Sequence, residues 1–441
     1  MIKRILYTLL IMFPVVASAQ INTDRVMAIG RNALYFEDYV LSIQYFNQVI
    51  NAKPYLSDPY FYRGLAKINL DDFQGAESDC SEAIERNPFV VSAYQVRGLA
   101  RIQQNNFAGA IEDYTKALEF DPENIGVWHN MALCRIRQED YKGAKNDLDK
   151  LIAISPRYTK AYLMRGEVDL KQKDTLAAEK DFGKAIEIDR YDADTWASRA
   201  ILRLQQQRYK DAEADFDHAI RLSTRNSGVY INRALARYHQ NNLRGAMSDY
   251  DIALDIDPNN FIGHYNRGLL RAQVGDDNRA IQDFNFVIEM EPDNMMAIFN
   301  RGLLLDQTGD YKGAIKDYST VINEYPNFLL GYQYRAQARR KIGDVKGADA
   351  DEFKVLKAQL DKQNGVDPNK QTADNTENNK TRKKSDKNMN NYRKIVVADN
   401  EEGEEKYKSD YRGRVQDKNV NIVPQPMFVL TYYAVSYTHL R

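Results

Sequence analysis

The chain has 441 residues, with 61 Lys or Arg against 62 Asp or Glu, so its formal net charge at pH 7 is −1. A chain with so little net charge has no overall field to attract a polyanion, which makes nucleic acid a poor candidate partner, and its 43% hydrophobic and 28% charged residues are typical of soluble proteins. Two cysteines, Cys80 and Cys134, are too few for a disulfide framework, and we expect both to be free and buried.

The N-terminus is typical of a secretory signal peptide, residues 1–19. Lys3 and Arg4 precede an apolar run that ends at Val16, and small residues then lead to a predicted cleavage after Ala19. The alternative is a retained membrane anchor, but this needs about 20 apolar residues and the run is shorter. We therefore predict an exported protein, periplasmic or associated with the cell envelope, with no stable membrane span after cleavage.

A period of 34 residues governs the chain from Thr23 to about residue 362. The period is marked most clearly by Pro54, Pro88, Pro122, Pro156, Pro258, Pro292 and Pro326. A fixed period of this length indicates a repeat architecture, in which each unit buries its apolar face by stacking on its neighbours. No insertion is needed, so residues 23–362 divide into ten repeats in which the proline occupies position 32.

Each repeat predicts two helices joined by a turn near position 15 or 16. Position 8 is always Gly or Ala, and position 20 is Ala in every repeat except the first, where it is Ser42, so the two helices can approach closely. Positions 20, 24 and 27 recur at helical spacing and form the buried face of the second helix. Asp or Asn at position 16 caps this helix in most repeats, and the proline ends it. The predicted fold is all-α.

These positions resemble the tetratricopeptide repeat family. Aromatic residues recur at positions 4, 17 and 24, with small residues at positions 8 and 20, Ala, Val or Leu at position 27 and proline at position 32, over about three quarters of the chain. The resemblance implies a right-handed superhelical solenoid of about ten helix-turn-helix repeats that acts as a non-catalytic protein-binding scaffold.

Three departures from this pattern carry their own expectations. Arg190 and Thr224 replace the proline in consecutive repeats, which predicts a softer junction or altered twist there; simple tolerance at a loop position is the alternative. Glu352 replaces the aromatic residue at position 24 of the last repeat, and a polar residue there suits a terminal cap.

Arg at position 7 and Asp at position 23 recur along the repeats, which gives them an Arg-Gly/Asp (RG/D) character. In an antiparallel hairpin, positions whose numbers sum to about 31 lie level, so the two can face each other. Each Asp could also reach the Arg of the following repeat, which would give an alternating ladder broken at Met131. A functional anion-binding stripe is disfavoured because each Arg has a matching Asp. The ladder residues are Arg63, Asp79, Arg97, Asp113, Arg165, Asp181, Arg199, Asp215, Arg233, Asp249, Arg267, Asp283, Arg301, Asp317 and Arg335.

In the family, positions 2, 5, 9, 12 and 13 of the first helix line a concave groove that holds a partner segment. The candidates here are Phe61, Leu65, Ile68, Asn69, Leu99, Gln103, Leu133, Ile201, Gln205, Ile231, Leu235, His239, Tyr265, Leu269, Gln273, Phe299, Leu303 and Gln307. An apolar stripe with neutral polar rims suits a peptide or helix partner. The alternative is that the position-9 leucines only pack within the repeats.

Some family members grip a terminal carboxylate with Lys at positions 2 and 5 and Asn at positions 6 and 9. Here Asn130, Asn232, Asn266 and Asn300 hold position 6, but no Lys occupies position 5, so we expect this clamp to be absent. The five histidines form no pair at i and i+4, and no Gly-rich phosphate loop or nucleophile elbow occurs. We therefore expect no catalytic residue, no metal site and no cofactor.

Beyond the repeats, residues 363–391 are rich in Asn, Lys, Gln and Asp, which predicts a disordered linker. Residues 392–434 are β-rich and suit part of an incomplete domain. The last seven residues, 435–441, resemble a translated sequencing adapter, so we expect the natural chain to continue beyond about residue 434.

The sequence leaves three hypotheses for function. The preferred one is an exported scaffold that binds another envelope protein in the groove. The second is an array that targets or regulates an enzymatic or envelope-anchoring domain following it in the chain. The third is self-association through the repeats.

Overall fold

The computed structural model describes residues 22–223, 225–363, 389, 392–395 and 398. The described residues form twenty α-helices and no strand, which confirms the all-α prediction. They belong to two compact units, one containing residues 22–156 and the other residues 157–398, and each is described by itself.

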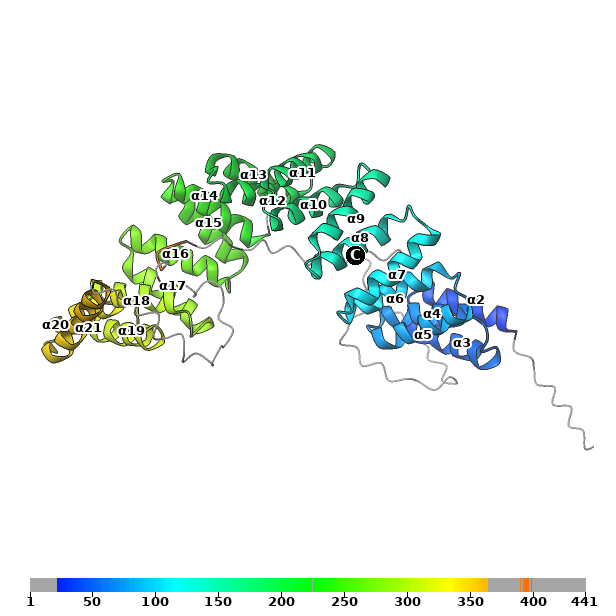
Figure 1. The fold of residues 1–441 in the computed structure, drawn as a ribbon, viewed down its shortest axis with the longest axis horizontal. Helices are drawn as coiled ribbons and strands as arrows, with labels where there is room; N and C mark the ends of the chain where they lie inside the picture. Colours follow the sequence, from blue (N-terminus) through cyan, green and yellow to red (C-terminus); the bar gives the residue numbers. More distant parts are fainter. Residues whose placement is uncertain (1–21, 224, 364–388, 390–391, 396–397, 399–441) are drawn as a thin grey trace, which may run out of the picture. The chain divides into compact units, whose positions relative to one another are not determined.

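The first unit contains repeats 1 to 4, each a pair of helices (Figure 1). Its helices are α2 (Thr23–Tyr35), α3 (Tyr39–Ala52), α4 (Asp58–Asn69), α5 (Phe73–Arg86), α6 (Val91–Gln103), α7 (Phe107–Phe120), α8 (Ile125–Arg137) and α9 (Tyr141–Ile154).

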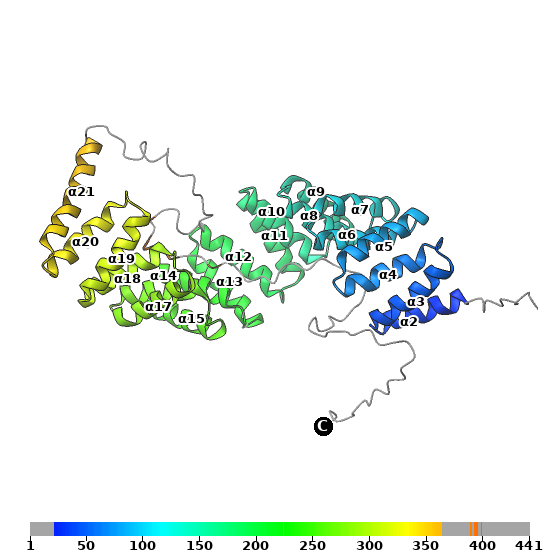
Figure 2. The same ribbon diagram turned by 90° about the horizontal axis from the view of Figure 1, so that it is seen from below.

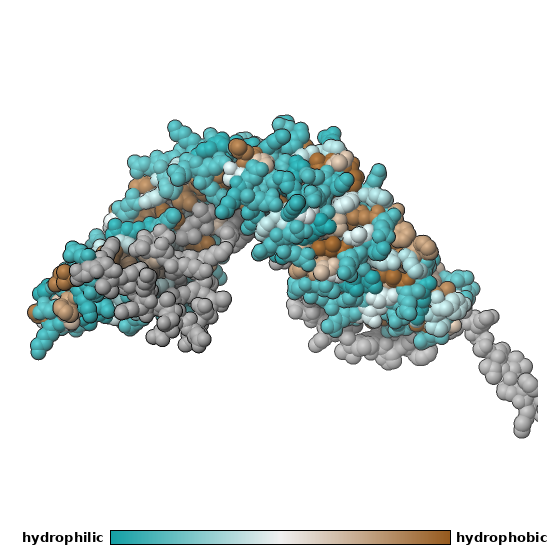
Figure 3. Space-filling view, viewed as in Figure 1, coloured by the Kyte–Doolittle hydropathy of each residue, from teal (hydrophilic) through white to brown (hydrophobic). Residues whose placement is uncertain are grey.

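The second unit contains repeats 5 to 10, whose helix pairs stack in chain order (Figure 2). Its helices are α10 (Thr159–Lys171), α11 (Thr175–Ile188), α12 (Ala193–Gln205), α13 (Tyr209–Leu222), α14 (Ser227–His239), α15 (Leu243–Ile256), α16 (Phe261–Gln273), α17 (Asp277–Met290), α18 (Met295–Thr308), α19 (Tyr311–Glu324), α20 (Leu329–Lys341) and α21 (Val345–Gln363). The visible surface of the repeats is mostly hydrophilic, with scattered hydrophobic patches (Figure 3).

The turn inside each repeat has a fixed conformation. Position 15 has a positive φ in all ten repeats. The first seven repeats carry a non-glycine residue there, with φ between 59° and 66°, and the last three carry Gly, as at Gly275. The next residue then caps the second helix: the side chain of Asp or Asn at position 16 accepts a hydrogen bond from a backbone N–H three residues on in eight repeats. Asp276 and Arg208 make no such bond.

The core of each repeat is the contact between positions 8 and 24. The side chain at position 24 is fully buried in repeats 1 to 9, whereas Glu352 in repeat 10 is exposed and pairs with Arg340. A Cβ added to Gly166 would lie 2.5 Å from the ring of Phe182, and one added to Gly98 would lie 2.8 Å from Tyr114. The small residue therefore gives the aromatic ring its room, and each buried ring contributes about 1.5–3 kcal/mol.

Each Arg at position 7 lies against the Asp at position 23 of its own repeat, with N–O distances of 2.5–2.8 Å in eight repeats. A second cation on the Asp comes from position 11 of the same repeat in six repeats, as between Arg203 and Asp215 at 2.8 Å, and in repeat 4, where position 7 is Met131, the position-11 Arg135 pairs with Asp147 in its place. The link to the preceding repeat goes instead to position 25, as between Arg233 and Asp217 at 2.7 Å. The alternating ladder, in which each Asp meets two position-7 arginines, is therefore not the arrangement found.

Both cysteines are free and buried, as predicted. Burial raises the pKa of both thiols, that of Cys134 to about 12, so neither is ionised at neutral pH. No helix of the described chain has the length and apolar character needed to cross a bilayer.

Several predicted features lie wholly or largely outside the described residues. They include residues 1–19, residues 435–441 and most of the ranges 363–391 and 392–434. The softer junction stays a prediction, because Thr224 is not described; at Arg190 the backbone carbonyl accepts a hydrogen bond from the Trp196 ring nitrogen at 3.0 Å.

Candidate functional site

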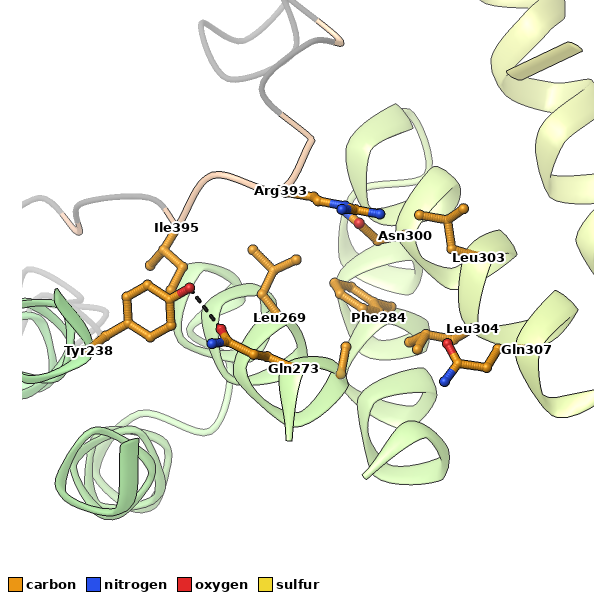
Figure 4. A pocket seen from close by; sticks show the side chains of 11 residues that line it. Tyr238, Leu269, Gln273, Phe284, Asn300, Leu303, Leu304, Gln307, Arg393 and Ile395 are labelled. Carbon is orange, nitrogen blue, oxygen red and sulfur yellow. Dashed lines mark hydrogen bonds between the residues drawn. The ribbon is translucent and has the colours of Figure 1, made fainter. Parts of the chain in front are cut away.

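Groove positions from consecutive repeats meet in the second unit. A cavity of about 360 Å³ lies between the first helices of repeats 7, 8 and 9, which are α14, α16 and α18 (Figure 4). Its walls include Leu269 and Leu303 at position 9 and Gln273 and Gln307 at position 13. The Tyr238 hydroxyl donates to the Gln273 side-chain oxygen at 2.8 Å. We call the surface formed by α14, α16 and α18 the groove.

A segment of the chain's own C-terminal region lies in this groove. Its described residues are Met389, Tyr392–Ile395 and Ala398, and we call them the docked segment. Arg393 and Ile395 line the cavity together with the helix residues, and Figure 4 shows Ile395 beside Tyr238 and Leu269. The groove therefore already holds residues contributed from beyond the repeats.

Tyr392 is held at its backbone and at its ring. Its carbonyl oxygen accepts hydrogen bonds from the Tyr265 hydroxyl at 2.7 Å and from the Asn300 side-chain nitrogen at 2.6 Å. The ring packs edge-on against Phe299, with centroids 4.8 Å apart, and against Phe328 at 6.4 Å. One aromatic pocket and two polar donors thus fix this residue in repeats 8 and 9.

Ala398 is held at the other end of the docked segment by a single side chain. The Asn232 amide nitrogen donates to the Ala398 carbonyl oxygen at 2.9 Å, and the Ala398 backbone N–H donates to the Asn232 amide oxygen at 3.0 Å. Both residues are buried, with Asn232 fully inaccessible. An amide side chain can satisfy a backbone donor and a backbone acceptor at once, so this contact does not depend on the side chain of the bound residue.

Apolar contacts complete the docking. Met389 is buried in the cluster that contains Phe299 and Met296. Ile395 packs against the cluster that contains Leu235, and Ala398 belongs to the one that contains Ile231. Burying these side chains against preformed apolar walls favours the bound arrangement by the hydrophobic effect.

The position-6 asparagines therefore matter in a way that the sequence analysis missed. They were considered only as part of a carboxylate clamp, whereas Asn232 and Asn300 bind the backbone of the docked segment. Asn266, fully buried, holds the same position in the repeat between them. The available signal was that these three asparagines occupy one position in three consecutive repeats.

The remaining predicted groove residues of the second unit are less closely involved. His239 stacks on Tyr209, with ring centroids 4.5 Å apart. Ile201 is half-buried beside a core cluster, and Gln205 is exposed.

In the first unit the predicted groove positions lie mainly in packing. Phe61 and Leu65 are buried in one cluster with Ile68 at its edge, and the Asn69 amide donates to the carbonyl of Leu65 at 2.7 Å. Of the other three, Leu133 is buried, Leu99 is half-buried and Gln103 is exposed. Part of the stripe in this unit is thus intra-repeat core, which was the alternative considered from the sequence.

Metal-binding clusters of three or more His, Cys, Asp or Glu side chains are absent from the described part of the chain. The residues of α14, α16, α17 and α18 that line the cavity are apolar or carry neutral polar groups, and the charged group at its wall, Arg393, belongs to the docked segment. The site is therefore suited to binding through hydrogen bonds and apolar contact.

Family models match the repeat region in five stretches. A model described as TPR repeat matches residues 98–134. One described as tetratricopeptide repeat matches residues 125–158 and 159–192. Another with the same description matches residues 198–261 and 265–327. The ranges 125–158 and 159–192 coincide with repeats 4 and 5 as the proline period defines them.

Solved structures are similar at low identity. A tetratricopeptide repeat protein from Parabacteroides merdae is 21% identical over 56% of this chain and 98% of its own, with a TM-score of 0.45. YrrB, described as a TPR protein with an unusual peptide-binding site, is 20% identical over 42% of this chain and 95% of its own, with a TM-score of 0.35. Yeast Tom70 is 15% identical over 76% of this chain and 91% of its own, with a TM-score of 0.36. No curated protein matches the chain.

Proposed function

We propose that this chain, which carries tetratricopeptide repeats, is a non-catalytic scaffold whose groove binds an extended segment of a protein partner. One observation carries the proposal. Asn232 makes two hydrogen bonds to the backbone of Ala398, one as donor and one as acceptor. A side chain in this arrangement recognises an extended main chain, which is how grooves and sheet edges bind peptides with limited dependence on sequence.

The chemistry of the groove supports a peptide more than other ligands. Its helix walls offer Leu269, Leu303 and amide side chains, and the Tyr392 carbonyl is bound by neutral donors. A terminal carboxylate or a phosphate would favour cationic donors instead. An extended peptide with one or two apolar side chains satisfies both the amides and the apolar walls.

The proposed setting is the cell envelope. The basic, apolar and small residues in order at the N-terminus support export, because this is the pattern that the secretion machinery recognises. The partner would then be another exported or envelope protein, and no cofactor or nucleic acid is needed.

Site-specific photo-crosslinking in the native envelope tests the proposal. A photoreactive residue replaces Gln307, which lines the cavity, and in a matched control it replaces Lys316, which is exposed on the second helix of the same repeat. We expect a discrete adduct from position 307 that maps to one segment of one partner and is lost when Asn232→Leu is added. Adducts of equal yield from both positions, or an adduct indifferent to Asn232→Leu, would refute groove binding.

A second candidate is that the array positions a domain that follows it in the chain. The docked segment favours this, because it brings residues from beyond the repeats, such as Ala398, into the groove. Peptide mapping of the adduct from position 307 distinguishes the two. An adduct from position 307 that is only intramolecular supports this second candidate, and an intermolecular adduct supports the first.

A further inference from the structure

We propose that the docked segment is an intramolecular ligand of the groove, and that the partner which displaces it carries the same three-residue pattern: an aromatic residue, an aliphatic residue three positions later, and a small residue three positions after that. This inference rests on the proposed function, because it specifies the segment that the groove binds. Its evidence is the set of contacts that Tyr392, Ile395 and Ala398 make in the groove.

The contacts of the docked segment run along the first helices of the groove. Tyr392 contacts Asn300 in repeat 9, and Ala398 contacts Asn232 in repeat 7. Ile395, between them in sequence, packs beside the cluster that contains Leu235 of repeat 7 and lines the cavity with Leu269 of repeat 8. The side chains at positions 392, 395 and 398 therefore each occupy a place in the groove.

These contacts assign a role to each of the three residues. The aromatic residue enters the pocket made by Phe299 and Phe328, and its carbonyl is bound by Asn300. The aliphatic residue lies over repeats 7 and 8, where Ile395 packs now. The small residue receives both hydrogen bonds of Asn232, as Ala398 does now. Ala398 is only 2% exposed, so the residue in its place is enclosed by protein. A larger side chain at this last place would meet the walls of a filled cluster.

The docked segment does not fill the groove completely, which explains how a partner can displace it. The 360 Å³ cavity remains beside Arg393 and Ile395 and is lined by two glutamines and several apolar side chains. A partner residue that enters it gains contacts that the docked segment does not make. Arg393 is exposed at the cavity wall. A partner segment with a bulky apolar side chain in the place of Arg393 would fill the cavity.

Attachment in the same chain strengthens the docked segment as a competitor. Residues 364–388 connect the end of α21 to Met389. A tether makes binding intramolecular, with effective concentrations on the order of millimolar for short linkers. A partner must therefore exceed this competition, and weakening the docked segment should increase the affinity for any segment added from outside.

The test measures binding of a fluorescent peptide with the sequence of residues 389–400 to the full chain, by anisotropy. Two variants release the docked segment by different means. Ala398→Pro removes the N–H that donates to Asn232 while changing little in size, and the double variant Tyr392→Ser with Ile395→Ser removes two apolar side chains. The matched control is Lys394→Ser, at an exposed residue of the same segment.

We expect both releasing variants to bind the peptide at least tenfold more tightly than the wild type, and Lys394→Ser to behave as the wild type does. Adding Asn232→Leu to a releasing variant should weaken peptide binding by about tenfold, because one side chain supplies two backbone hydrogen bonds. A peptide with Ser at the places of Tyr392 and Ile395 should not bind. Circular dichroism confirms that each variant has its full helix content.

The proposal is overturned if the well-folded releasing variants bind the peptide no more tightly than the wild type does, or if the Ser-substituted peptide binds equally well. The photo-crosslinking from position 307 fails or succeeds separately. A mapped partner adduct with no peptide binding leaves the scaffold function standing and removes the intramolecular ligand. Peptide binding with no partner adduct does the reverse.

Discussion

Asp147 is the place where the ion-pair network lacks a member, and its substitution by Asn should stabilise the protein. In repeat 4 position 7 is Met131, so Asp147 keeps only Arg135, whose Nε lies 3.2 Å from Oδ2. That oxygen is buried and accepts no hydrogen bond among the described residues. Burial is the main cause that raises the pKa of Asp147 to about 7; Asp140 raises it further, while Arg135 opposes the shift.

The sign of the effect follows from the direction of the shift. The folded pKa lies above the ordinary value of 3.8, so the folded state binds a proton that the unfolded state releases between about pH 4 and pH 7. The free energy of unfolding should therefore fall as the pH rises through this window and level off above it. A shift of about three units corresponds to about 4 kcal/mol, an upper figure for the ionised carboxylate.

Asn resembles the protonated carboxyl and does not ionise. We expect Asp147→Asn to raise the free energy of unfolding by about 1–4 kcal/mol at pH 8 and to leave it nearly unchanged at pH 4. The matched control is Asp215→Asn, which removes the partner of Arg199 and Arg203 from the same position of repeat 6. The control should lose about 3–5 kcal/mol at pH 8, because the partly buried Arg199 loses its carboxylate and Arg203 keeps only Glu179.

Urea unfolding at pH 4, 6 and 8 measures both variants, and the two tryptophans report on the two repeats separately. Trp128 lies in repeat 4 with Asp147, and Trp196 lies in repeat 6 with Asp215. Fluorescence is followed in backgrounds where the other tryptophan is Phe. If Asp147→Asn lowers the unfolding midpoint at pH 8 as the control does, the reasoning from an unpaired buried carboxylate is wrong. A loss below about 1 kcal/mol in Asp215→Asn would show that the paired network behaves as an exposed one.

Three further predictions concern stability and reactivity. Gly166→Ala should destabilise the chain by about 1–3 kcal/mol in thermal unfolding, because its Cβ meets an aromatic ring at 2.5 Å, whereas Gly183→Ala, with nothing nearer than 4.0 Å, should stabilise by up to about 1 kcal/mol. Burial raises the pKa of Asp283, but hydrogen bonds from His264 and an arginine outweigh burial and leave the pKa lowered. The ionised Asp283 therefore adds to the free energy of unfolding fully above about pH 4, and this stabilisation is lost as the pH falls through the folded pKa. Acid titration followed by circular dichroism should show His264→Ala unfolding at a higher pH than the wild type. Cys134 should resist thiol reagents in the native protein and react once urea unfolds it; rapid reaction without urea would contradict its burial.

The helices and their packing could be predicted from the sequence because each rule recurs in most of the ten repeats. Proline, the capping Asp or Asn and the small residue at position 8 each act locally, so their period alone fixes the hairpins. The partner of an ion pair between repeats could not be fixed in this way. Counting residues from a turn shows which positions lie level, but it does not give the lateral offset of neighbouring helices. That offset brings Arg233 to Asp217 at position 25, while Arg237 supplies the second cation of Asp249.

The docked segment could not be predicted at all, and the reason is physical. Asn232 and Ala398 are 166 residues apart, and neither belongs to a pattern that implies the other. Residues 363–391 have the composition of a linker, so Met389 gave no sign that it would be buried. A single contact of this kind depends on complementary shape at one place, which periodicity does not encode.

The arrangement of charges explains why the groove is left to amides and apolar side chains. Each Asp at position 23 faces the position-7 Arg of its repeat or a cation at position 11, and most of the position-7 arginines also bond to the preceding repeat, as Arg267 does to Asp251. These charges therefore act within the stack, where they fix the register of neighbouring repeats. What the first helices present to a ligand is then position 6 and the apolar positions beside it. Selectivity in such a groove depends on the backbone groups that the amides bind and on the side chains that its walls enclose, as they enclose Tyr392, Ile395 and Ala398.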